Sequence, residues 1–389
     1  MPGIYLHIPF CKQACHYCNF HFSTSLRHKP TMLKAMLQEI RLRRDYLQGA
    51  TLDSIYFGGG TPSLLSTAEL MRFFDTIFQY FPVAPDAEIT LEANPDDLTV
   101  DKIAALRQTP VNRLSIGIQS FAEADLQWMN RAHRADEAQV CIENALAAGF
   151  DNLTVDLIYG APTTPDAQWI ANIQKVLDYG IPHISCYALT VEPATALAHF
   201  VKTGKTRPVD EEQAARQFEI LIQMLQTHGY EHYEISNFAL PGRYARHNSS
   251  YWSGEAYLGI GPSAHSFDGG LVRRWNVAHN AHYWQYMATA ETPEALSQLQ
   301  GTLFEQEVLT PAQRYNEYVM TALRTMWGVQ ADRLWRMDEA FAAYFEQKVQ
   351  PFIRAGQVQQ LEQTYTLTAA GKLLADFIAS ELFWESKSN

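Results

Sequence analysis

Short apolar runs alternate with amphipathic segments over roughly the first 230 residues. The apolar runs have the character of strands, and they occupy residues 4–8, 54–57, 88–93, 113–118, 153–159 and 183–189. Each is followed by apolar residues at helical spacing. Strands joined through helices run parallel with right-handed crossovers, so the pattern predicts six β/α units. Six units make three-quarters of an eight-fold barrel, which is a curved and partly open sheet.

Several of the predicted helices carry start and stop signals. Ser66 and Glu69 form a capping-box pattern ahead of apolar residues at three- and four-residue spacing, from Leu70 to Phe81. Asp136 is predicted to cap the start of another helix, and Gly149 to end it. Pro165 is predicted to open a helix that ends near Gly180. Asp210 is predicted to precede a further helix.

The pattern changes after about residue 240. Residues 241–285 are rich in Gly, His, Trp, Tyr and Asn and have little periodicity, so they predict an ordered loop region. Helical spacing returns at 311–326 and 339–354. A hairpin is predicted at 358–367, and a last helix at 369–383. Helices followed by a hairpin resemble a winged helix.

These patterns predict an α/β protein with three parts. Residues 1–240 form a partial (β/α)6 barrel, residues 241–300 a junction segment, and residues 301–389 a mostly helical, winged-helix-like domain. From residue 302 onward acidic residues outnumber basic ones. A DNA-binding role for this last part is therefore disfavoured, and a structural or partner-docking cap is expected.

Composition narrows the class of protein. The chain has 389 residues, of which 47% are hydrophobic, and this is enough for a large core. A net charge of −12 argues against nucleic acid and against an anionic membrane surface as partners. No apolar run approaches the roughly 20 residues of a membrane helix, and no signal-peptide pattern opens the chain. Few, clustered cysteines fit a reducing cytosol, so a cytoplasmic location is expected.

Three cysteines near the start carry the strongest chemical signal. Cys11, Cys15 and Cys18 form a CxxxCxxC run directly after the strand predicted at 4–8. They are expected on a loop at the C-terminal end of that strand, where α/β proteins place their chemistry. A cubane iron–sulfur cluster has four irons, so three thiolates leave one iron open. The two other cysteines, Cys141 and Cys186, lie more than 100 residues away and are expected to be core thiols.

Two alternatives remain for these cysteines. A zinc site would need a fourth ligand such as His16 or His21, but zinc ligands usually come as two separated pairs. A disulfide framework is disfavoured because five cysteines are an odd number and nothing suggests export. An open iron–sulfur cluster is the preferred interpretation, with zinc second.

A glycine-rich turn and a set of polar residues follow later strands. Residues 58–62 read Gly-Gly-Gly-Thr-Pro, which is neither a Walker loop nor GxGxxG. Glycines let backbone N–H groups approach a ligand closely. Glu92, Gln119 and Asp156 lie at the ends of the next three strands, and Arg131 follows in a helix-like stretch. Buried carboxylates are costly without partners, so this series predicts a site for a polar ligand.

Together these residues resemble the radical S-adenosylmethionine (SAM) superfamily. Within it they are most similar to the branch of oxygen-independent coproporphyrinogen oxidase (HemN) and its relative, the heme chaperone HemW, over nearly the whole chain. The resemblance implies a [4Fe-4S] cluster whose open iron binds SAM. It also implies an electron donor, because one-electron reduction cleaves SAM to methionine and a 5′-deoxyadenosyl radical.

The resemblance assigns roles residue by residue. The implied cluster ligands are Cys11, Cys15 and Cys18. The implied SAM contacts are Tyr5, Tyr17, Gly59, Gly60, Thr61, Glu92, Gln119, Arg131 and Asp156. On this basis Tyr17 shields the cluster, Gly59 and Gly60 reach the methionine end of SAM, and Gln119 and Asp156 reach the nucleoside.

Two features favour the chaperone over the oxidase. Phe20 stands where the oxidase carries a further cysteine, and the cluster motif comes without a long preceding segment. Residues 247–252 match the HNxxYW motif associated with the chaperone, which makes His247, Tyr251 and Trp252 candidate heme-binding residues. A neutral imidazole is a common axial ligand of heme iron. The alternative is that the motif only orders the domain junction, with His247 bonded to the backbone.

Further aromatic residues near the junction are open to two interpretations. By resemblance, His265 is expected near SAM. The set Trp275, Tyr283, Trp284 and Tyr286 lines a porphyrin-sized cleft or packs the junction, and the sequence favours neither.

The sequence therefore predicts a heme chaperone that holds a cluster, SAM and heme. Its expected partners are heme, an electron donor and acceptor hemoproteins, with membrane association of the acceptor left open and no nucleic acid. Enzymatic activity is left undecided. The alternatives are oxygen-independent decarboxylation of coproporphyrinogen III, a radical SAM methyltransferase, and a zinc-stabilised scaffold without redox function.

Overall fold

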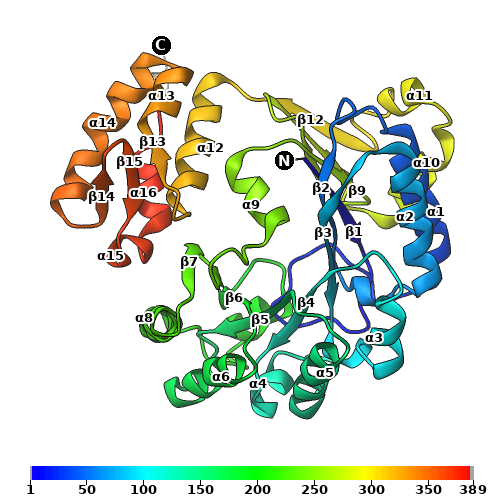
Figure 1. The fold of residues 1–389 in the computed structure, drawn as a ribbon, viewed down its shortest axis with the longest axis horizontal. Helices are drawn as coiled ribbons and strands as arrows, with labels where there is room; N and C mark the ends of the chain where they lie inside the picture. Colours follow the sequence, from blue (N-terminus) through cyan, green and yellow to red (C-terminus); the bar gives the residue numbers. More distant parts are fainter. Residues whose placement is uncertain (1, 386–389) are drawn as a thin grey trace.

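The computed structural model describes residues 2–385 and contains the six predicted parallel strands in sequential order (Figure 1). Each strand pairs in parallel with the next one. The strands are β1 (Gly3–Ile8), β2 (Leu52–Gly59), β3 (Val83–Ala93), β4 (Arg113–Gln119), β5 (Leu153–Tyr159) and β6 (His183–Ala188). They are mostly buried on both faces, as parallel strands between a core and covering helices must be.

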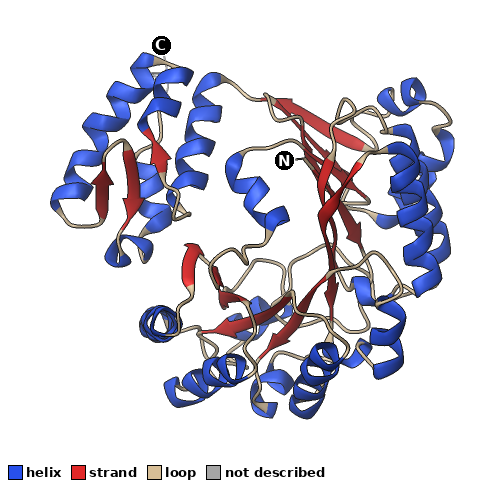
Figure 2. Ribbon diagram, in the orientation of Figure 1, coloured by secondary structure: helices blue, strands red, loops and turns tan. Residues whose placement is uncertain are grey.

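Helices cover the outer face of this curved sheet (Figure 2). The α-helices are α1 (Lys29–Leu42), α2 (Thr67–Tyr80), α3 (Val100–Leu106), α4 (Glu123–Trp128), α5 (Ala135–Ala147), α6 (Asp166–Asp178), α7 (Ala196–Lys202) and α8 (Glu211–Thr227). Two 3-10 turns, η1 (Pro62–Leu64) and η2 (Pro95–Asp97), follow β2 and β3. No helix within residues 2–385 combines the length and apolarity needed to cross a bilayer.

The sheet continues beyond the six parallel strands and does not close. Next to β1 lie β9 (Tyr257–Ile260), β10 (His265–Phe267), β11 (Val272–Asn276) and β12 (Phe304–Val308). Next to β6 lie β8 (Asn237–Ala239) and β7 (Glu231–Glu234). The predicted partial barrel is confirmed as the central part of a 12-stranded open sheet.

The prediction of a loop region at residues 241–285 is wrong. This segment contains α9 (Arg246–Ser253), strands β9 to β11, and the start of α10 (Asn280–Thr289), which α11 (Pro293–Ser297) follows. The strands are only three to five residues long, so they carry almost no periodicity. They form because β9 adds in parallel to the free edge of β1, which is a tertiary pairing that no local pattern encodes.

Most predicted helix boundaries are confirmed. Ser66 and Glu69 form the expected capping box at the start of α2, and Asp210 accepts hydrogen bonds from the backbone of α8. Pro165 precedes α6, and Gly149 and Gly180 adopt the left-handed conformation after their helices. The Asp136 cap is wrong: α5 starts at Ala135, because the Glu137 carboxylate accepts the Arg134 backbone N–H, and Asp136 lies in the first turn.

The C-terminal segment forms a second, smaller unit with winged-helix order. Its elements are α12 (Pro311–Leu323), β13 (Val329–Gln330), α13 (Ala331–Met337), α14 (Glu339–Arg354), β14 (Val358–Leu361), β15 (Thr364–Leu367), α15 (Ala369–Lys372) and α16 (Ala375–Glu381). The hairpin is confirmed, whereas the last predicted helix is two short helices. A hydrophobic cluster around Tyr315, Phe345 and Ile378 forms the core of this unit. The three predicted domain ranges remain a sequence-based division.

Helix α2 is held on the sheet by aromatic packing. The rings of Phe73 and Phe74 contact Phe57 of β2 with centroid distances of 5.9 and 5.4 Å. All three side chains are fully buried. Phe78, one turn after Phe74, stacks on that ring but is 45% exposed. The apolar stripe that the sequence predicts is therefore buried along only part of its width.

We expect Phe74→Ala to lower the free energy of unfolding by about 3–5 kcal/mol, because it leaves a cavity between α2 and β2. The matched change Phe78→Ala, on the same helix, should cost about 1 kcal/mol or less. Denaturant titration followed by circular dichroism measures both. Equal losses for the two variants would contradict the packing described here.

Candidate functional site

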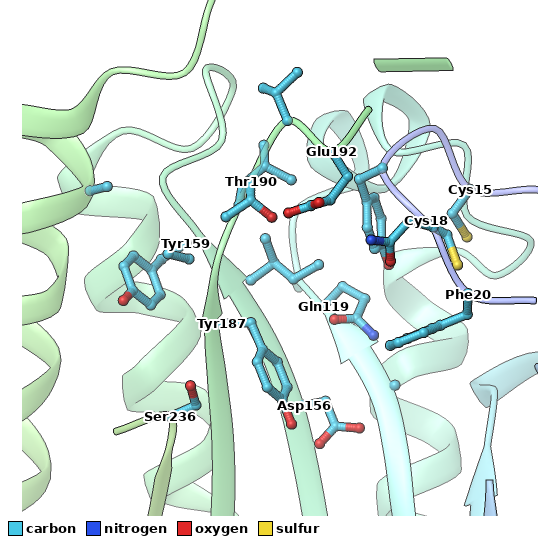
Figure 3. Close-up of a pocket in the computed structure, with 18 of the residues that line it drawn as sticks. Cys15, Cys18, Phe20, Gln119, Asp156, Tyr159, Tyr187, Thr190, Glu192 and Ser236 are labelled. Atoms are coloured by element: carbon cyan, nitrogen blue, oxygen red, sulfur yellow. The ribbon is translucent and has the colours of Figure 1, made fainter. Parts of the chain in front are cut away.

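A cavity of about 1210 Å³ opens at the C-terminal ends of the parallel strands (Figure 3). It brings together the three cysteines and all the predicted SAM contacts except Tyr5. These lining residues are Cys11, Cys15, Cys18, Tyr17, Gly59, Gly60, Thr61, Glu92, Gln119, Arg131 and Asp156. Residues that lie far apart in the sequence therefore share one site, as the rule for the ends of parallel strands predicts.

The cysteine loop is fixed to the glycine-rich turn by backbone hydrogen bonds. The Gly60 N–H donates to the Ile8 carbonyl at 2.9 Å, and the Thr61 N–H donates to the Phe10 carbonyl at 2.7 Å. A Cβ atom at position 60 would lie 2.6 Å from the Phe10 carbonyl oxygen, so only glycine fits. Gly59 has a φ of 103°, and a Cβ there would collide with His7. The glycines thus hold the cysteine loop in place, in addition to their predicted approach to a ligand.

The thiols lie in a partly buried environment with one cationic neighbour. Burial, with smaller contributions from Cys18 and Cys15, raises the pKa of Cys11 to about 11, against a hydrogen bond with Thr61. Arg131 places Nη1 3.4 Å from the Cys15 sulfur. Its other guanidinium nitrogen, Nη2, donates to the Asn94 Oδ1 and to the Gly117 carbonyl at 2.7 and 2.8 Å. A guanidinium so fixed stabilises negative charge on thiolate ligands.

The donor set fits an iron–sulfur cluster with one open iron. All three thiols are half-buried at the cavity, whereas Cys141 and Cys186 are buried elsewhere as the predicted core thiols. Three soft thiolates without a fourth protein thiol match a site-differentiated cluster.

The histidines that the zinc interpretation needs are engaged elsewhere. His16 Nδ1 lies 2.8 Å from the Trp128 carbonyl, and His21 Nε2 lies 2.8 Å from Asn280 Oδ1. Within residues 2–385, no three His, Cys, Asp or Glu side chains lie close enough together to bind one metal ion.

Two carboxyl groups line the inner part of the cavity with raised pKa values. Burial raises the pKa of Glu92 to about 7, although hydrogen bonds from Tyr56 and from the Gly59 N–H lower it. Burial likewise raises the pKa of Asp156 to about 6, against hydrogen bonds from serines. Carboxyl groups poised near neutral pH can accept hydrogen bonds from a ligand or hold a proton beside it.

Gln119 is held in a strained backbone conformation. Its φ is 67°, which is uncommon for a residue other than glycine, and the pairing of β4 with β5 shifts register just before it. A Cβ atom at Gly117 would lie 2.9 Å from the Gln119 Nε2, so the glycine leaves room for the amide. Figure 3 shows Gln119, Asp156, Cys15 and Cys18 around the same cavity. Such strain is typical of residues that a site holds in position.

A second cavity of about 510 Å³ adjoins the first and contains the HNxxYW motif. Its lining includes His247, Asn248, Tyr251 and Trp252 of α9, together with Tyr5. The residues that line both cavities are Glu92, Tyr187, Ser236 and Arg324. Figure 1 shows α9 between the C-terminal unit and the sheet. Tyr5, a predicted SAM contact, thus borders the second cavity instead of the first.

His247 is buried and fully hydrogen-bonded in this conformation. It is 1% exposed, its Nδ1 lies 2.8 Å from the Ser54 hydroxyl, and its Nε2 lies 2.9 Å from the Tyr251 hydroxyl. Burial lowers its pKa to about 3, so the imidazole is neutral. Its partners are side chains, not the backbone that the structural alternative named. Axial ligation of heme by His247 remains a prediction, and it requires the Tyr251 hydroxyl to leave Nε2.

The structure shows where the histidine and the aromatic side chains of the junction lie. His265 is exposed on β10, stacks on Trp275 and lines neither cavity, and its place near SAM stays a prediction. The junction aromatics pack: Tyr283 donates to buried Glu39 at 2.6 Å, and Trp284 lies against His28.

Sequence reasoning missed the part of the cavity wall that the C-terminal unit supplies. That wall consists of Arg324, Lys372, Leu373, Leu374, Ala375, Asp376 and Phe377. No local motif marks these residues, because only the docking of the two units brings them to the cavity. Asn94, which holds Arg131, was also missed, although it lies two residues after Glu92.

We expect Glu92→Gln to flatten the pH dependence of stability. Glu92 has a folded pKa of about 7, above its ordinary 4.5. Between these values the folded state holds a proton that the unfolded state has lost, so the free energy of unfolding falls as the pH rises. Removing the carboxyl should reduce this fall by up to about 3 kcal/mol. Urea titrations of the cofactor-free protein from about pH 5 to about pH 8 measure the difference, and parallel curves for both proteins would contradict it.

Comparison with known proteins agrees with this geometry. Residues 5–176 match the Radical SAM superfamily, and residues 309–374 match the HemN C-terminal domain. The heme chaperone HemW of Mycobacterium tuberculosis is 34% identical over 384 residues, covering 98% of this chain and 94% of that protein. The Bacillus subtilis HemW is 32% identical over 380 residues, covering 97% of each.

A solved structure shows the same fold. The coproporphyrinogen III oxidase HemN of Escherichia coli superimposes with a TM-score of 0.82 at 24% identity, covering 98% of this chain and 90% of that one. The near-complete coverage extends to both the open sheet and the C-terminal unit. The chain therefore belongs to the heme chaperone HemW family of the radical SAM superfamily.

Proposed function

We propose that this protein is a heme chaperone that binds a [4Fe-4S] cluster, SAM and heme, and delivers heme to acceptor hemoproteins. The observation that carries the proposal is the cavity that gathers three half-buried thiols and polar strand-end residues next to the HNxxYW cavity. Its full-length relatives bear the name heme chaperone HemW. Heme and its acceptors are the proposed partners, together with an electron donor for the cluster.

In this proposal different residues of the first cavity bind the cluster and orient SAM. Cys11, Cys15 and Cys18 hold the cluster, and Arg131 neutralises charge beside Cys15. When bound and reduced, the cluster supplies one electron to SAM. The strand-end side chains orient SAM, with Glu92 and Asp156 as hydrogen-bond acceptors for its cationic and hydroxyl groups.

The chaperone is preferred to the oxidase because of the residue that follows the cluster motif. Phe20 lines the cavity and is 67% exposed, so an apolar ring occupies the place of the oxidase's further cysteine. An exposed aromatic ring at the mouth of a large cavity suits contact with a flat apolar cargo. The resemblance to HemN shows a shared fold and does not decide between the two activities.

One anaerobic experiment tests the proposed function. The protein is reconstituted with iron and sulfide, heme is added and the optical spectrum recorded, and coproporphyrinogen III is then supplied with SAM and a reductant. Stable heme binding without a decarboxylated product supports the chaperone. Steady conversion to protoporphyrinogen would make the protein an oxidase despite Phe20.

We expect Cys15→Ala to abolish the iron–sulfur absorption and SAM binding while the barrel stays folded, because Cys15 lies on a loop outside the core. Cys141→Ala is the matched control, since this buried thiol does not line the cavity and should leave cluster loading unchanged. Iron and sulfide analysis after reconstitution measures both. An intact cluster in Cys15→Ala would refute the ligand assignment.

A pair of variants tests His247 as a heme ligand. His247→Ala should weaken heme binding and change the heme spectrum without loss of the cluster. Tyr251→Phe should strengthen heme binding, because it removes the hydroxyl that occupies Nε2. If both variants match the unmodified protein in heme affinity and spectrum, His247 has only the structural role seen in this conformation.

A further inference from the structure

The C-terminal unit contributes an apolar surface to the first cavity. Leu373 and Leu374, between α15 and α16, and Phe377, in the first turn of α16, line it, and all three are exposed. Phe377 is 55% exposed. Phe20 lines the same cavity from the cysteine loop and is also exposed. Large apolar side chains exposed toward one cavity from two units indicate a ligand with an apolar body.

Beside this surface lies Lys372, a cation for which the described residues 2–385 supply no anionic partner. Lys372 lines the cavity, and its Nζ lies 2.9 Å from His232 Nδ1. His232 Nε2 lies 3.0 Å from the Ile235 carbonyl, so Nε2 carries the ring proton and Nδ1 accepts from the ammonium. Burial, together with the nearby Lys372 charge, lowers the pKa of His232 to about 3. The imidazole is therefore neutral and leaves the lysine charge uncompensated.

No carboxylate within residues 2–385 lies inside ion-pair distance, 4.0 Å, of Lys372. The carboxylate of Asp376, one turn further along the chain, pairs with Arg324 at 2.5 Å. Burial lowers the pKa of Lys372 to about 8, so the ammonium still predominates at neutral pH. A half-buried cation without an anion is costly, and a ligand carboxylate would relieve that cost.

We propose that Lys372 binds a propionate carboxylate of the heme cargo while Leu373, Leu374 and Phe377 contact its macrocycle. The inference rests on the proposed function and adds a binding surface on the C-terminal unit to the HNxxYW motif. Heme combines the two properties that this surface selects, because it has a broad apolar ring and two carboxylates at one edge. A small carboxylate would satisfy Lys372 and leave the three apolar side chains exposed.

Arg324 connects this surface to the motif. Its guanidinium carbon lies 5.9 Å from the centre of the Trp252 ring, and the residue lines both cavities. Because Arg324 belongs to both linings, a ligand in the first cavity can extend into the second while it stays in contact with the protein. None of the predicted SAM contacts belongs to the wall that the C-terminal unit supplies.

A double comparison of protein and ligand tests the proposal. Heme and heme dimethyl ester, in which both propionates are neutral, are titrated into the cluster-loaded protein and into Lys372→Met. We expect the unmodified protein to prefer free heme, and Lys372→Met to lose about 10- to 100-fold of that preference. Lys348→Met is the matched control, because Lys348 is exposed on the same unit and does not line the cavity. Lys372→Arg, which keeps the charge, should retain part of the preference.

Each outcome separates this inference from the function on which it rests. An unchanged preference in Lys372→Met, with cluster content and circular dichroism intact, would overturn the propionate contact. Weaker SAM binding with unchanged heme binding would assign Lys372 to SAM and would also overturn it. Absence of heme binding by the unmodified protein would overturn the proposed function itself, and with it this inference.

Discussion

The contact between two neighbouring strand ends is the constraint on which the site depends. Strands β1 and β2 pair in register up to Ile8 and Gly59, and the chain after each strand continues the contact through hydrogen bonds at Gly60 and Thr61. This contact fixes the position of the loop that carries all three cysteines. Because the backbones meet without room for a Cβ, the glycines are required for packing before any ligand is considered.

Charge is distributed unevenly around the cavity, in a way that suits ligands of mixed character. The thiols lie beside the Arg131 guanidinium, which two carbonyl-type oxygens hold in place. Deeper along the strands, Glu92 and Asp156 have pKa values raised toward neutrality by burial. The part of the wall that comes from the C-terminal unit carries Lys372, with no carboxylate of residues 2–385 at ion-pair distance. Burial is the common cause, since each group loses solvation that its partners within the protein replace only in part.

Helix α9 links the cavities and gives the HNxxYW motif a structural role in this conformation. The carboxylate of Glu88 on β3 accepts the backbone N–H groups of Arg246 and His247, which anchors the first turn of α9 to the sheet. Nε of Arg113, on β4, lies 3.8 Å from Oε2 of the same Glu88 carboxylate. The motif is thus attached to the barrel at one end and lies against the C-terminal unit at the other. A ligand that displaced Tyr251 from His247 would therefore act on α9, which contacts both the barrel and the C-terminal unit.

The sequence by itself determined the parallel strands, most helix ends, the cysteine motif and nearly every strand-end residue of the cavity. Most of these features are local, because periodicity, helix caps and motif spacing each depend on residues close together in the sequence. The strand-end residues could be grouped because parallel topology brings the ends of the strands to one edge of the sheet. Tertiary structure alone decided the remainder. The short strands β9 to β11 form by adding one after another beyond the edge of β1, with β9 alone pairing with β1, and Lys372 reaches the cavity because the C-terminal unit docks there. Contacts between segments far apart in the chain depend on packing and charge that no local pattern encodes.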